Sequence, residues 1–429
     1  MKSFMYILLI HQHFLEDNAA GGSRWNEMAR IWVENGHSVT VIAGDVHYMN
    51  GREGSKARKD FEIKVNEDNV QVIRCKLSRR YHRGFSGRLL AYFSFAFKAV
   101  YAGLRFAHSR YDWIIVTSPP LFVGLPGVLL SKWRHVPLVL EIRDLWPESA
   151  IETGVLKNKW LIGLSYRFEK YLYRQARWIS VLTPAFRERL IGRNGVDPCK
   201  IAIIPNAADF RWSKAALRRA SESGLREELG LKGKFVVIYV GAHGLANDLM
   251  QLVEAAALLR ATNAHFLLIG DGMQKRMLIQ EAASRQLTNI SFLDPVPKER
   301  IFDYIVMADA GVAVLKRADI FKTIYSNKTF DYFSCKKPVL MVIDGVSRDL
   351  VEQARAGMFA EPENPADLAR KVLIYMSDEA LLRRHGENGY RFVHARFDRD
   401  KLAREFLKCI ESQLEVTDKS AIFESKKVN

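Results

Sequence analysis

Short apolar runs alternate with amphipathic stretches along most of this chain, and this alternation limits the possible folds more than any other feature. Residues 4–10 and 38–43 are nearly continuous apolar runs of strand length. Residues 23–34, between them, have helical periodicity that stops before Gly36. Further strand-like runs follow at residues 113–117, 136–142, 178–182 and 201–204. Apolar strands separated by helices are typical of a parallel sheet covered on both faces, so the sequence predicts an α/β fold.

The same alternation starts again after an interruption. Residues 209–234 are polar and basic, and they break the pattern. Strand-like runs then recur at residues 235–240, 265–269, 290–293, 311–315 and 339–343, with helical patterns at 247–260 and 273–285. A chain of 429 residues is also too long for one ordinary core. We therefore expect two Rossmann-like domains, formed by residues 1–205 and 206–396.

Cysteine usage and hydropathy bear on the compartment. Four cysteines lie far apart without the CxxC spacing of a zinc site, so we expect reduced thiols in a reducing compartment: Cys75, Cys199, Cys335 and Cys409. The apolar run after Met1 is brief, is interrupted at His11 and has no small-residue cleavage site after it. We interpret this run as a buried strand and not as a signal peptide. Residues 121–130 are too few to span a bilayer, and no transmembrane segment is expected.

Three glycine-containing turns follow predicted strands, at residues 20–23, 241–244 and 270–272. Each places backbone N–H groups at a helix N-terminus on the carboxyl edge of a parallel sheet, where open α/β folds bind phosphates. None is a complete GxGxxG or Walker A sequence, and any one of them alone could simply be a tight connection. Two domains with such turns facing one cleft favour a nucleotide site. No acidic residue follows the first turn at the spacing of a ribose-binding carboxylate, which disfavours hydride chemistry.

Residues 326–339, SNKTFDYFSCKKPV, place the carboxylate of Asp331 seven residues before a Pro-Val pair. This segment resembles the donor-site signature of retaining GT-B glycosyltransferases of family 4. It resembles especially the branch that builds bacterial surface polysaccharides, which includes fucosamine-transferase-like enzymes. Companion motifs occur in the same order over residues 5–395: Gly21-Gly22 with Arg24, RDLWPES at 143–149, residues 239–249, Gly270-Asp271-Gly272 with Lys275, and residues 356–362.

The resemblance implies a GT-B fold, with an acceptor-binding domain at residues 1–205 and a donor-binding domain at 206–396. It also implies that the helix at 397–416 packs back on the first domain, followed by a polar tail at 417–429. The nucleotide-sugar would be a substrate, so no cofactor is expected. We find no DxD-type carboxylate cluster, and we expect cations and helix N-termini to neutralise the leaving group without a metal ion.

The sequence departs from the family pattern at several positions. Thr323 stands where the family carries its first glutamate, and Asp331 replaces the second. Ala242-His243 and Asn247-Asp248 replace the usual Arg and Lys after the first donor-domain strand. Arg143-Asp144 stands where many relatives have His-Asp. The donor sugar therefore stays open, and the charge that binds the diphosphate must come from elsewhere.

Candidate donor-binding residues follow from these motifs. Lys328 is the first candidate for the diphosphate, and Lys275 is the second. We expect Asp331 to accept hydrogen bonds from the ribose hydroxyls, although a first-turn aspartate could instead simply favour the helix dipole. The remaining donor-site candidates are the backbones of Gly22, Gly244 and Gly272, the amide of Asn327, and His243 near the sugar.

Candidate catalytic residues lie in the first half, at Arg143, Asp144 and Glu148. Asp144 closes a predicted strand at its carboxyl edge. It could orient the acceptor hydroxyl, or it could pair with Arg143 and cap the following helix. Glu148 is a second carboxylate of the same kind.

The formal charge of +16 indicates nucleic acid, anionic lipid or a phosphorylated substrate as partner. Basic residues gather beside aromatic ones in two stretches of the predicted acceptor domain. The first stretch contains Arg74, Lys76, Arg79, Arg80, His82, Arg83 and Arg88 with Phe85, Tyr92, Phe93, Phe95, Phe97, Tyr101 and Phe106; the second contains Arg167, Lys170, Arg174 and Arg177 with Tyr166, Phe168, Tyr171 and Tyr173. Such helices are typical of attachment to an anionic bilayer, although aromatic stripes can equally pack the core. No nucleic-acid-binding motif is present, so no nucleic-acid partner is expected.

These observations predict a cytoplasmic glycosyltransferase, peripheral on the inner face of the cytoplasmic membrane. It would move a sugar from a nucleotide-sugar, UDP-linked by our expectation, to a lipid-linked or glycan acceptor. The product would be cell-surface polysaccharide such as lipopolysaccharide O-antigen, capsule or exopolysaccharide. Two alternatives stay open: a non-hydrolysing nucleotide-sugar epimerase of the same fold, and a non-catalytic glycan-binding relative.

Overall fold

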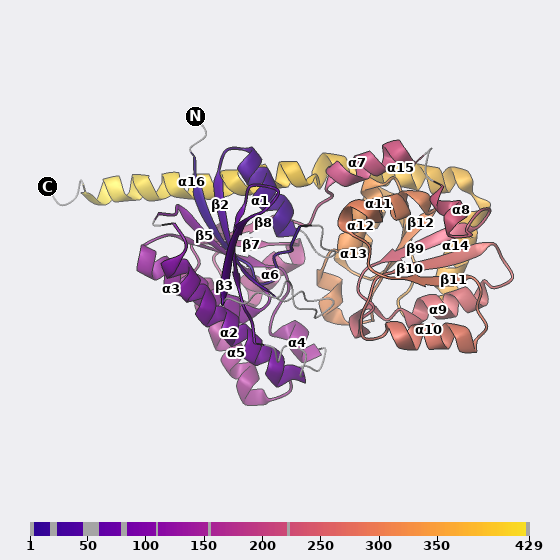
Figure 1. Ribbon diagram of the computed structural model, residues 1–429, viewed down its shortest axis with the longest axis horizontal. Helices are drawn as coiled ribbons and strands as arrows, with labels where there is room; N and C mark the ends of the chain where they lie inside the picture. Colours follow the sequence, from indigo (N-terminus) through magenta and orange to yellow (C-terminus); the bar gives the residue numbers. More distant parts are fainter. Residues whose placement is uncertain are drawn as a thin grey trace.

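The computed structural model describes residues 4–17, 24–45, 60–78, 84–108, 110–152, 156–220 and 224–425. It contains two largely parallel sheets, each with helices on both faces, in two domains that lie side by side (Figure 1). This is the doubly wound α/β arrangement expected from the sequence, with two Rossmann-like domains.

The first sheet has eight strands in the order β3-β4-β2-β1-β5-β6-β7-β8. These strands are β1 (Tyr6–Ile10), β2 (Ser38–Gly44), β3 (Phe61–Val65), β4 (Gln71–Cys75), β5 (Trp113–Ser118), β6 (Leu138–Ile142), β7 (Trp178–Val181) and β8 (Ile201–Ile203). All pair in parallel except β3, which runs antiparallel to β4 at the edge of the sheet. The sequence analysis did not predict this hairpin, because β3 is short and partly exposed and so lacks the buried apolar run of a central strand.

Helices of the first domain form a separate core on each face of the sheet. One core joins the sheet to α2 (Gly84–Arg105), α3 (Gly124–Arg134), α5 (Lys159–Gln175) and α6 (Pro184–Asn194). The other joins it to α1 (Arg24–Glu34) and α16 (Arg399–Ser425). The short α4 (Glu148–Glu152) follows β6 at the carboxyl edge of the sheet.

The second sheet has six parallel strands in the order β11-β10-β9-β12-β13-β14. They are β9 (Phe235–Val240), β10 (Ala264–Ile269), β11 (Ile290–Leu293), β12 (Ala310–Val314), β13 (Val339–Val342) and β14 (Gly357–Phe359). One face carries α7 (Phe210–Arg219), α11 (Lys298–Met307), α12 (Asn327–Ser334), α13 (Val346–Ala354) and α15 (Glu379–Arg396). The other face carries α9 (Met250–Leu258), α10 (Lys275–Ser284) and α14 (Pro365–Ser377).

Two chain segments cross between the domains and pair with each other. Ala208 N–H donates to the carbonyl of Phe397 (2.9 Å), and Arg399 N–H donates to the carbonyl of Ala208 (3.0 Å). After this second crossing α16 lies along α1, and Phe406 packs among Trp25, Trp32 and Trp178. In Figure 1 the yellow α16 runs the length of the first domain and past it.

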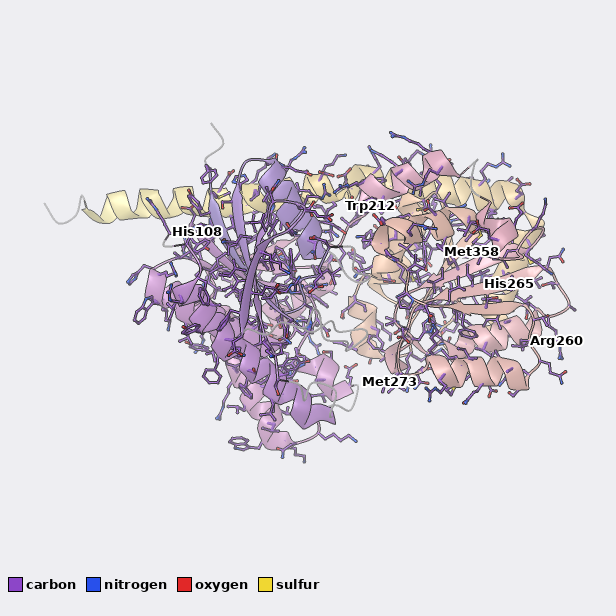
Figure 2. The ribbon with its side chains drawn as sticks, in the orientation of Figure 1. His108, Trp212, Arg260, His265, Met273 and Met358 are labelled. Atoms are coloured by element: carbon purple, nitrogen blue, oxygen red, sulfur yellow. The ribbon has the colours of Figure 1, made fainter. Side chains whose placement is uncertain are left out.

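Two segments differ from the sequence predictions. Residues 209–234 contain α7 and α8 (Leu225–Glu228), where the sequence predicted a break in the pattern. Asp209 caps α7 by accepting from Arg211 N–H (3.0 Å), and Trp212 of this helix lies where the second domain faces the first (Figure 2). The C-terminal helix continues to Ser425, so most of the predicted polar tail at 417–429 is helical.

Candidate nucleotide-sugar site

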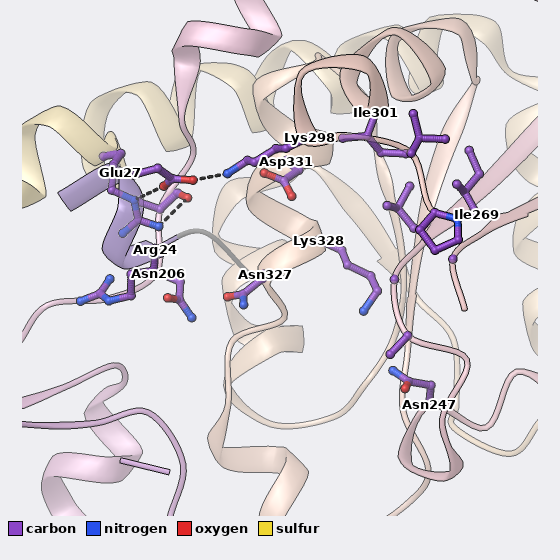
Figure 3. A pocket seen from close by; sticks show the side chains of 18 of the residues that line it. Arg24, Glu27, Asn206, Asn247, Ile269, Lys298, Ile301, Asn327, Lys328 and Asp331 are labelled. Carbon is purple, nitrogen blue, oxygen red and sulfur yellow. Dashed lines mark hydrogen bonds and ion pairs between the residues drawn. The ribbon is translucent and has the colours of Figure 1, made fainter. Parts of the chain in front are cut away.

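A cavity of about 300 Å³ lies between the carboxyl edges of the two sheets (Figure 3). The first domain and the crossing segments contribute Arg24, Glu27, Arg143, Asn206, Ala207 and Arg399. The second domain contributes Val240, Gly241, Ala242, Asn247, Ile269, Gly270, Pro295, Val296, Lys298, Ile301, Asn327, Lys328 and Asp331.

The position of the cavity follows from the strand order. In the second sheet the chain runs from β9 to β10 and β11 on one side, and then returns to β12 on the other side of β9. Ligands of open α/β sheets bind at such a switch point, beyond the carboxyl ends of the strands. The turn after β9, the turn after β10 and the N-terminus of α12 all meet there.

Two glycines allow the turns after β9 and β10 to pack against each other. Gly241 has φ +146° and Gly270 has φ +152°, both of which favour glycine. A Cβ on Gly270 would lie 1.8 Å from the carbonyl oxygen of Gly241, which no side chain can tolerate. The close packing of these turns shapes one wall of the cavity.

Lys328 is a cation in the cavity wall. It is the second residue of α12, and its Nζ lies 4.9 Å from the ring centre of Tyr239. Burial lowers the pKa of Lys328 to about 8, although Asp331 opposes the change. Among the described residues, no ion pair is found for this ammonium group. Lys328 is therefore charged at neutral pH and placed to receive an anion.

Asp331 lies one turn further along α12 and lines the same cavity. Burial raises the pKa of its carboxyl to about 6, against the opposing effect of the nearby Lys298. The group is thus largely ionised at neutral pH and can accept hydrogen bonds from neutral hydroxyls. Lys328 offers a cationic group that can donate to phosphate, and Asp331 offers a carboxylate that can accept from a sugar diol.

A set of ion pairs connects the two domains beside Asp331. Glu27 of α1 binds Lys298 of α11, and its Oε2 accepts from Nε of Arg399 (2.7 Å). Figure 3 shows Lys298 between Glu27 and Asp331. These charged residues were not predicted from the sequence. Lys298 could have been noticed in the sequence, because it is the first residue of a helix that follows a strand. Its partner Glu27 could not, because it is 271 positions away.

Arg24 and Arg143 form the first-domain side of the cavity. Arg24 is buried, with Nε 3.2 Å from Oε2 of Glu141, and its guanidinium also donates to the carbonyls of Ile204 (2.9 Å) and Pro205 (2.6 Å). Arg143 Nε lies 4.0 Å from Glu141, and its side chain is partly exposed. Arg143, a candidate catalytic residue, thus lines the cavity, whereas Arg24 ties the crossing segment to β6.

Several predicted donor-site residues lie outside the cavity lining. Lys275 Nζ donates to the carbonyls of Gly270 (2.9 Å) and Leu293 (3.0 Å) and to Oδ1 of Asp294 (2.6 Å). An ammonium group has three donors, so these contacts use all of them. Lys275 therefore stabilises the turns behind the cavity wall.

His243 is fully buried, and burial lowers its pKa to about 4, so the ring is neutral. It packs between Tyr239 and Phe292 and does not line the cavity. Gly272, with φ +156°, lets its turn approach the backbone of His243, where a Cβ would lie 2.5 Å from the carbonyl oxygen. Gly244 only precedes the short turn η3 (Leu245–Asn247). Of the predicted donor-site residues, the cavity collects Asn327, Lys328 and Asp331, while Gly22 lies outside the described residues.

The predicted catalytic carboxylates occupy structural positions. Asp144 accepts hydrogen bonds from Ser149 and from Leu145 N–H, and burial raises its pKa to about 6. These contacts are those of a residue that caps the turn before α4. Glu148 is bound by Arg193 and lies 3.9 Å from Arg189, both on α6, so the cavity does not include it.

The family's missing first glutamate falls on a turn that docks against the first domain. This turn is η4 (Asp319–Thr323), and the hydroxyl of Thr323 donates to the carbonyl of Ile320 (2.6 Å). The carbonyl of Thr323 accepts from Oγ1 of Thr183 (2.7 Å), and Ile320 N–H donates to Glu152 (3.0 Å). Thr323 thus joins the domains and does not line the cavity.

Metal-ligand clusters and membrane-spanning helices are both absent from the described ranges. There, no three or more His, Cys, Asp or Glu side chains are grouped so as to hold a metal ion. Over the same residues, no helix has both the length and the apolar character needed to cross a bilayer.

Two family models together match most of the chain. Residues 20–207 match the Glycosyl transferase 4-like domain, and residues 222–392 match Glycosyl transferases group 1. The chain is therefore a GT-B glycosyltransferase of group 1, and its N-terminal domain is of the glycosyl transferase 4-like kind.

Similar proteins agree with this assignment. A protein of Escherichia coli strain K12 named as a colanic acid biosynthesis glycosyl transferase, WcaI, is 26% identical over 322 residues, 73% of this chain and 77% of its own. The sucrose-phosphate synthase of Thermosynechococcus elongatus has a TM-score of 0.72 at 18% identity, covering 96% of this chain and 100% of that one. Anabaena HepE in complex with UDP-glucose has a TM-score of 0.70 at 18% identity, covering 95% and 100%. At these identities the solved structures show the fold.

Proposed function

We propose that this glycosyltransferase takes a sugar from a UDP-linked donor bound in the cavity between the domains. Lys328 carries the proposal, because it is a half-buried cation in the cavity wall, one turn from an ionised carboxylate on the same helix. In this arrangement Lys328 neutralises the diphosphate that leaves, and Asp331 accepts hydrogen bonds from the ribose hydroxyls. The apolar side chains of Ile269, Val296 and Ile301 line the same cavity and suit contact with a nucleobase.

The acceptor sugar enters from the first-domain side in this proposal. Arg143 is the charged residue there that is only weakly paired, and it suits an acceptor that carries phosphate. Asp144 acts through the turn that it caps, because its carboxylate bonds Leu145 and Ser149. Transfer proceeds without a metal ion, and the retaining outcome rests on the resemblance to family 4 enzymes.

The acceptor is lipid-linked or glycan, and the product is a cell-surface polysaccharide. The likeness to WcaI, named for colanic acid biosynthesis, supports this class of pathway. The enzyme works on the inner face of the cytoplasmic membrane in this proposal, and the surface of the first domain supports that location.

Helices α2, α3 and α5 pack beside one another (Figure 1). They expose large apolar side chains. These are Leu90, Phe93, Phe97, Tyr101 and Leu104 on α2, Leu129 and Trp133 on α3, and Trp160, Leu164 and Tyr171 on α5. Trp133 and Trp160 are 74% and 73% exposed. Basic residues of α3 and α5 lie among them, including Lys132, Lys159, Arg167, Lys170 and Arg174. Aromatic and basic side chains on one face suit the interface of an anionic bilayer.

The structure divides the aromatic residues that suggested this surface. Phe95 and Tyr173 are core residues, whereas Phe93, Phe97, Tyr101 and Tyr171 are exposed. Arg79, Arg80, His82 and Arg83 lie outside the described residues. The proposed membrane surface therefore rests on the exposed subset, with Trp133 and Trp160 added.

A transfer assay tests the proposed reaction. Membranes are incubated with the purified enzyme and radiolabelled UDP-sugars, with and without a chelator. Label in the lipid fraction that survives the chelator supports the proposal, and activity that is lost and then restored by Mg²⁺ contradicts its metal-free part. Free sugar product without lipid label would indicate epimerase chemistry, and no turnover of any donor would indicate a non-catalytic relative.

A further inference from the structure

The ion pairs beside Asp331 lie at the crossing between the domains. Glu27 comes from α1 of the first domain, and Lys298 comes from α11 of the second. Arg399, which also binds Glu27, donates to the carbonyl of Ala207 (3.2 Å) on the other crossing segment. Glu27 therefore contacts both the second domain and a crossing segment.

Asp331 belongs to the same group of buried and half-buried charges. Lys298, Glu27, Arg399 and Asp209 face its carboxyl from α11, α1, α16 and the start of α7, and Lys328 faces it from its own helix. Arg30 of α1 lies 3.7 Å from Asp209 and completes the set. In a buried site each of these charges changes the cost of ionising its neighbours.

We propose that Glu27 and Lys298 are positioning residues for the nucleotide: their ion pair across the cleft sets the charge around Asp331 and so ties the ribose site to the contact between the domains. The inference rests on the proposed function, in which Asp331 holds the ribose. It adds a role for two residues that lie on different domains and act through Asp331.

The contacts explain how the coupling works. Burial lowers the pKa of the Lys298 ammonium, and its acidic neighbours Glu27, Asp331 and Asp209 raise it, with a net increase. With Glu27 in place, Lys298 is held by the first domain, and the oxygens of Asp331 stay open to ribose hydroxyls. Without Glu27, Lys298 keeps Asp331 and Asp209 as acidic neighbours, so the carboxyl of Asp331 stays ionised to lower pH.

Because the two residues carry opposite charges, removing each one should shift the pH dependence of UDP binding in the opposite direction. The carboxylate of Glu27 disfavours ionisation of Asp331, and the ammonium of Lys298 favours it. We measure UDP affinity against pH by calorimetry for the wild type, Glu27→Gln and Lys298→Met. The acidic midpoint of binding moves to lower pH in Glu27→Gln and to higher pH in Lys298→Met, by about one unit or more. The double variant returns toward the wild-type midpoint.

Asp303→Asn is the matched control, because it removes an ion pair on the same helix that stays within the second domain. Asp303 accepts from Arg219 of α7 (2.8 Å), away from the cavity, and the midpoint is expected to stay at the wild-type pH. A merely structural role for Glu27 and Lys298 would lower thermal stability without shifting the midpoint in opposite directions.

Midpoints that stay fixed or move in the same direction overturn the inference and leave the proposed function standing. If Glu27→Gln does not fold, an unmoved midpoint in Lys298→Met alone overturns it. Wild-type protein that binds no UDP at all contradicts the proposed function, and the inference fails with it.

Discussion

At the scale of single residues, the site depends on how burial changes the pKa values of Lys328 and Asp331. Pairs of exposed lysine and aspartate within one turn of each other are common on helices, and such a pair alone does not indicate a functional site. Here burial brings the pKa of the lysine down to about 8 and that of the aspartate up to about 6. Perturbed groups of opposite sign in one cavity are a stronger indication of function than either residue alone.

Replacement of Asp331 by Asn tests the ribose contact. We expect UDP affinity to fall about 10- to 100-fold, the range for losing hydrogen bonds to a charged acceptor. The melting temperature should fall little, because none of the described residues forms an ion pair with this carboxylate at hydrogen-bond distance. Glu379→Gln, an exposed change on α15, is the control, and unchanged affinity in Asp331→Asn would remove this residue from the site.

The same two groups predict how UDP binding depends on pH. Asp331 is ionised above its pKa of about 6, so the acceptor for the ribose is lost as the pH falls through that value. Lys328 is protonated below its pKa of about 8, so the attraction for the diphosphate is lost as the pH rises through that value. Affinity should therefore be greatest between about pH 6 and 8. A flat profile from pH 5 to 9, measured by calorimetry, would contradict both roles.

Sequence motifs located Asn327, Lys328, Asp331 and Arg143 at the cavity. They could not separate these from Lys275, whose donors are used by three oxygens of neighbouring turns. Distances across the fold are invisible to a motif. For the same reason, nothing in the sequence pairs Glu27 with Lys298.

At the scale of secondary structure, the buried strands and their helices were predictable because each has an apolar run or stripe of its own. The edge strand β3 was not, since its side chains are half-buried or exposed. Nor was α7, whose basic residues hide the small apolar face formed by Phe210 and Ala216. Elements stabilised mainly by tertiary contacts leave a weaker pattern in the sequence.

The packing of α16 on the first domain can be tested at Phe406. This ring contacts Trp178 (5.0 Å between ring centres), Trp32 (5.3 Å) and Trp25 (5.9 Å). Phe406→Ala should lower the free energy of unfolding of the first domain by about 3–5 kcal/mol, because it leaves a cavity in an aromatic core. Urea unfolding followed by tryptophan fluorescence measures the loss. Lys408→Ala, an exposed change on the same helix, should cost little by comparison.

The proposed membrane surface predicts selective binding to anionic vesicles. Wild-type protein should sediment with vesicles that contain phosphatidylglycerol and much less with phosphatidylcholine alone, because both charge and apolar insertion contribute. Trp133→Ala combined with Trp160→Ala should reduce the bound fraction several-fold. Leu258→Ala removes an exposed apolar side chain of the second domain and should leave binding unchanged. Equal binding to both vesicle types would contradict the proposed surface.

At the scale of the whole molecule, the two domains meet over one cavity, and the chain crosses between them twice. The two crossings pair with each other at Ala208, and the charges of Glu27, Lys298 and Arg399 lie beside them. The donor cavity and the crossing segments therefore share side chains.

The central claim is that the cavity holds a nucleotide diphosphate through Lys328, and the most direct measurement compares UDP with uridine. Calorimetry is performed with both ligands on the wild type and on Lys328→Met. We predict that the wild type binds UDP more tightly than uridine by at least about tenfold, and that Lys328→Met loses most of this preference while its uridine affinity stays the same. Equal preference in the two proteins, or no binding of UDP to the wild type, would contradict the account.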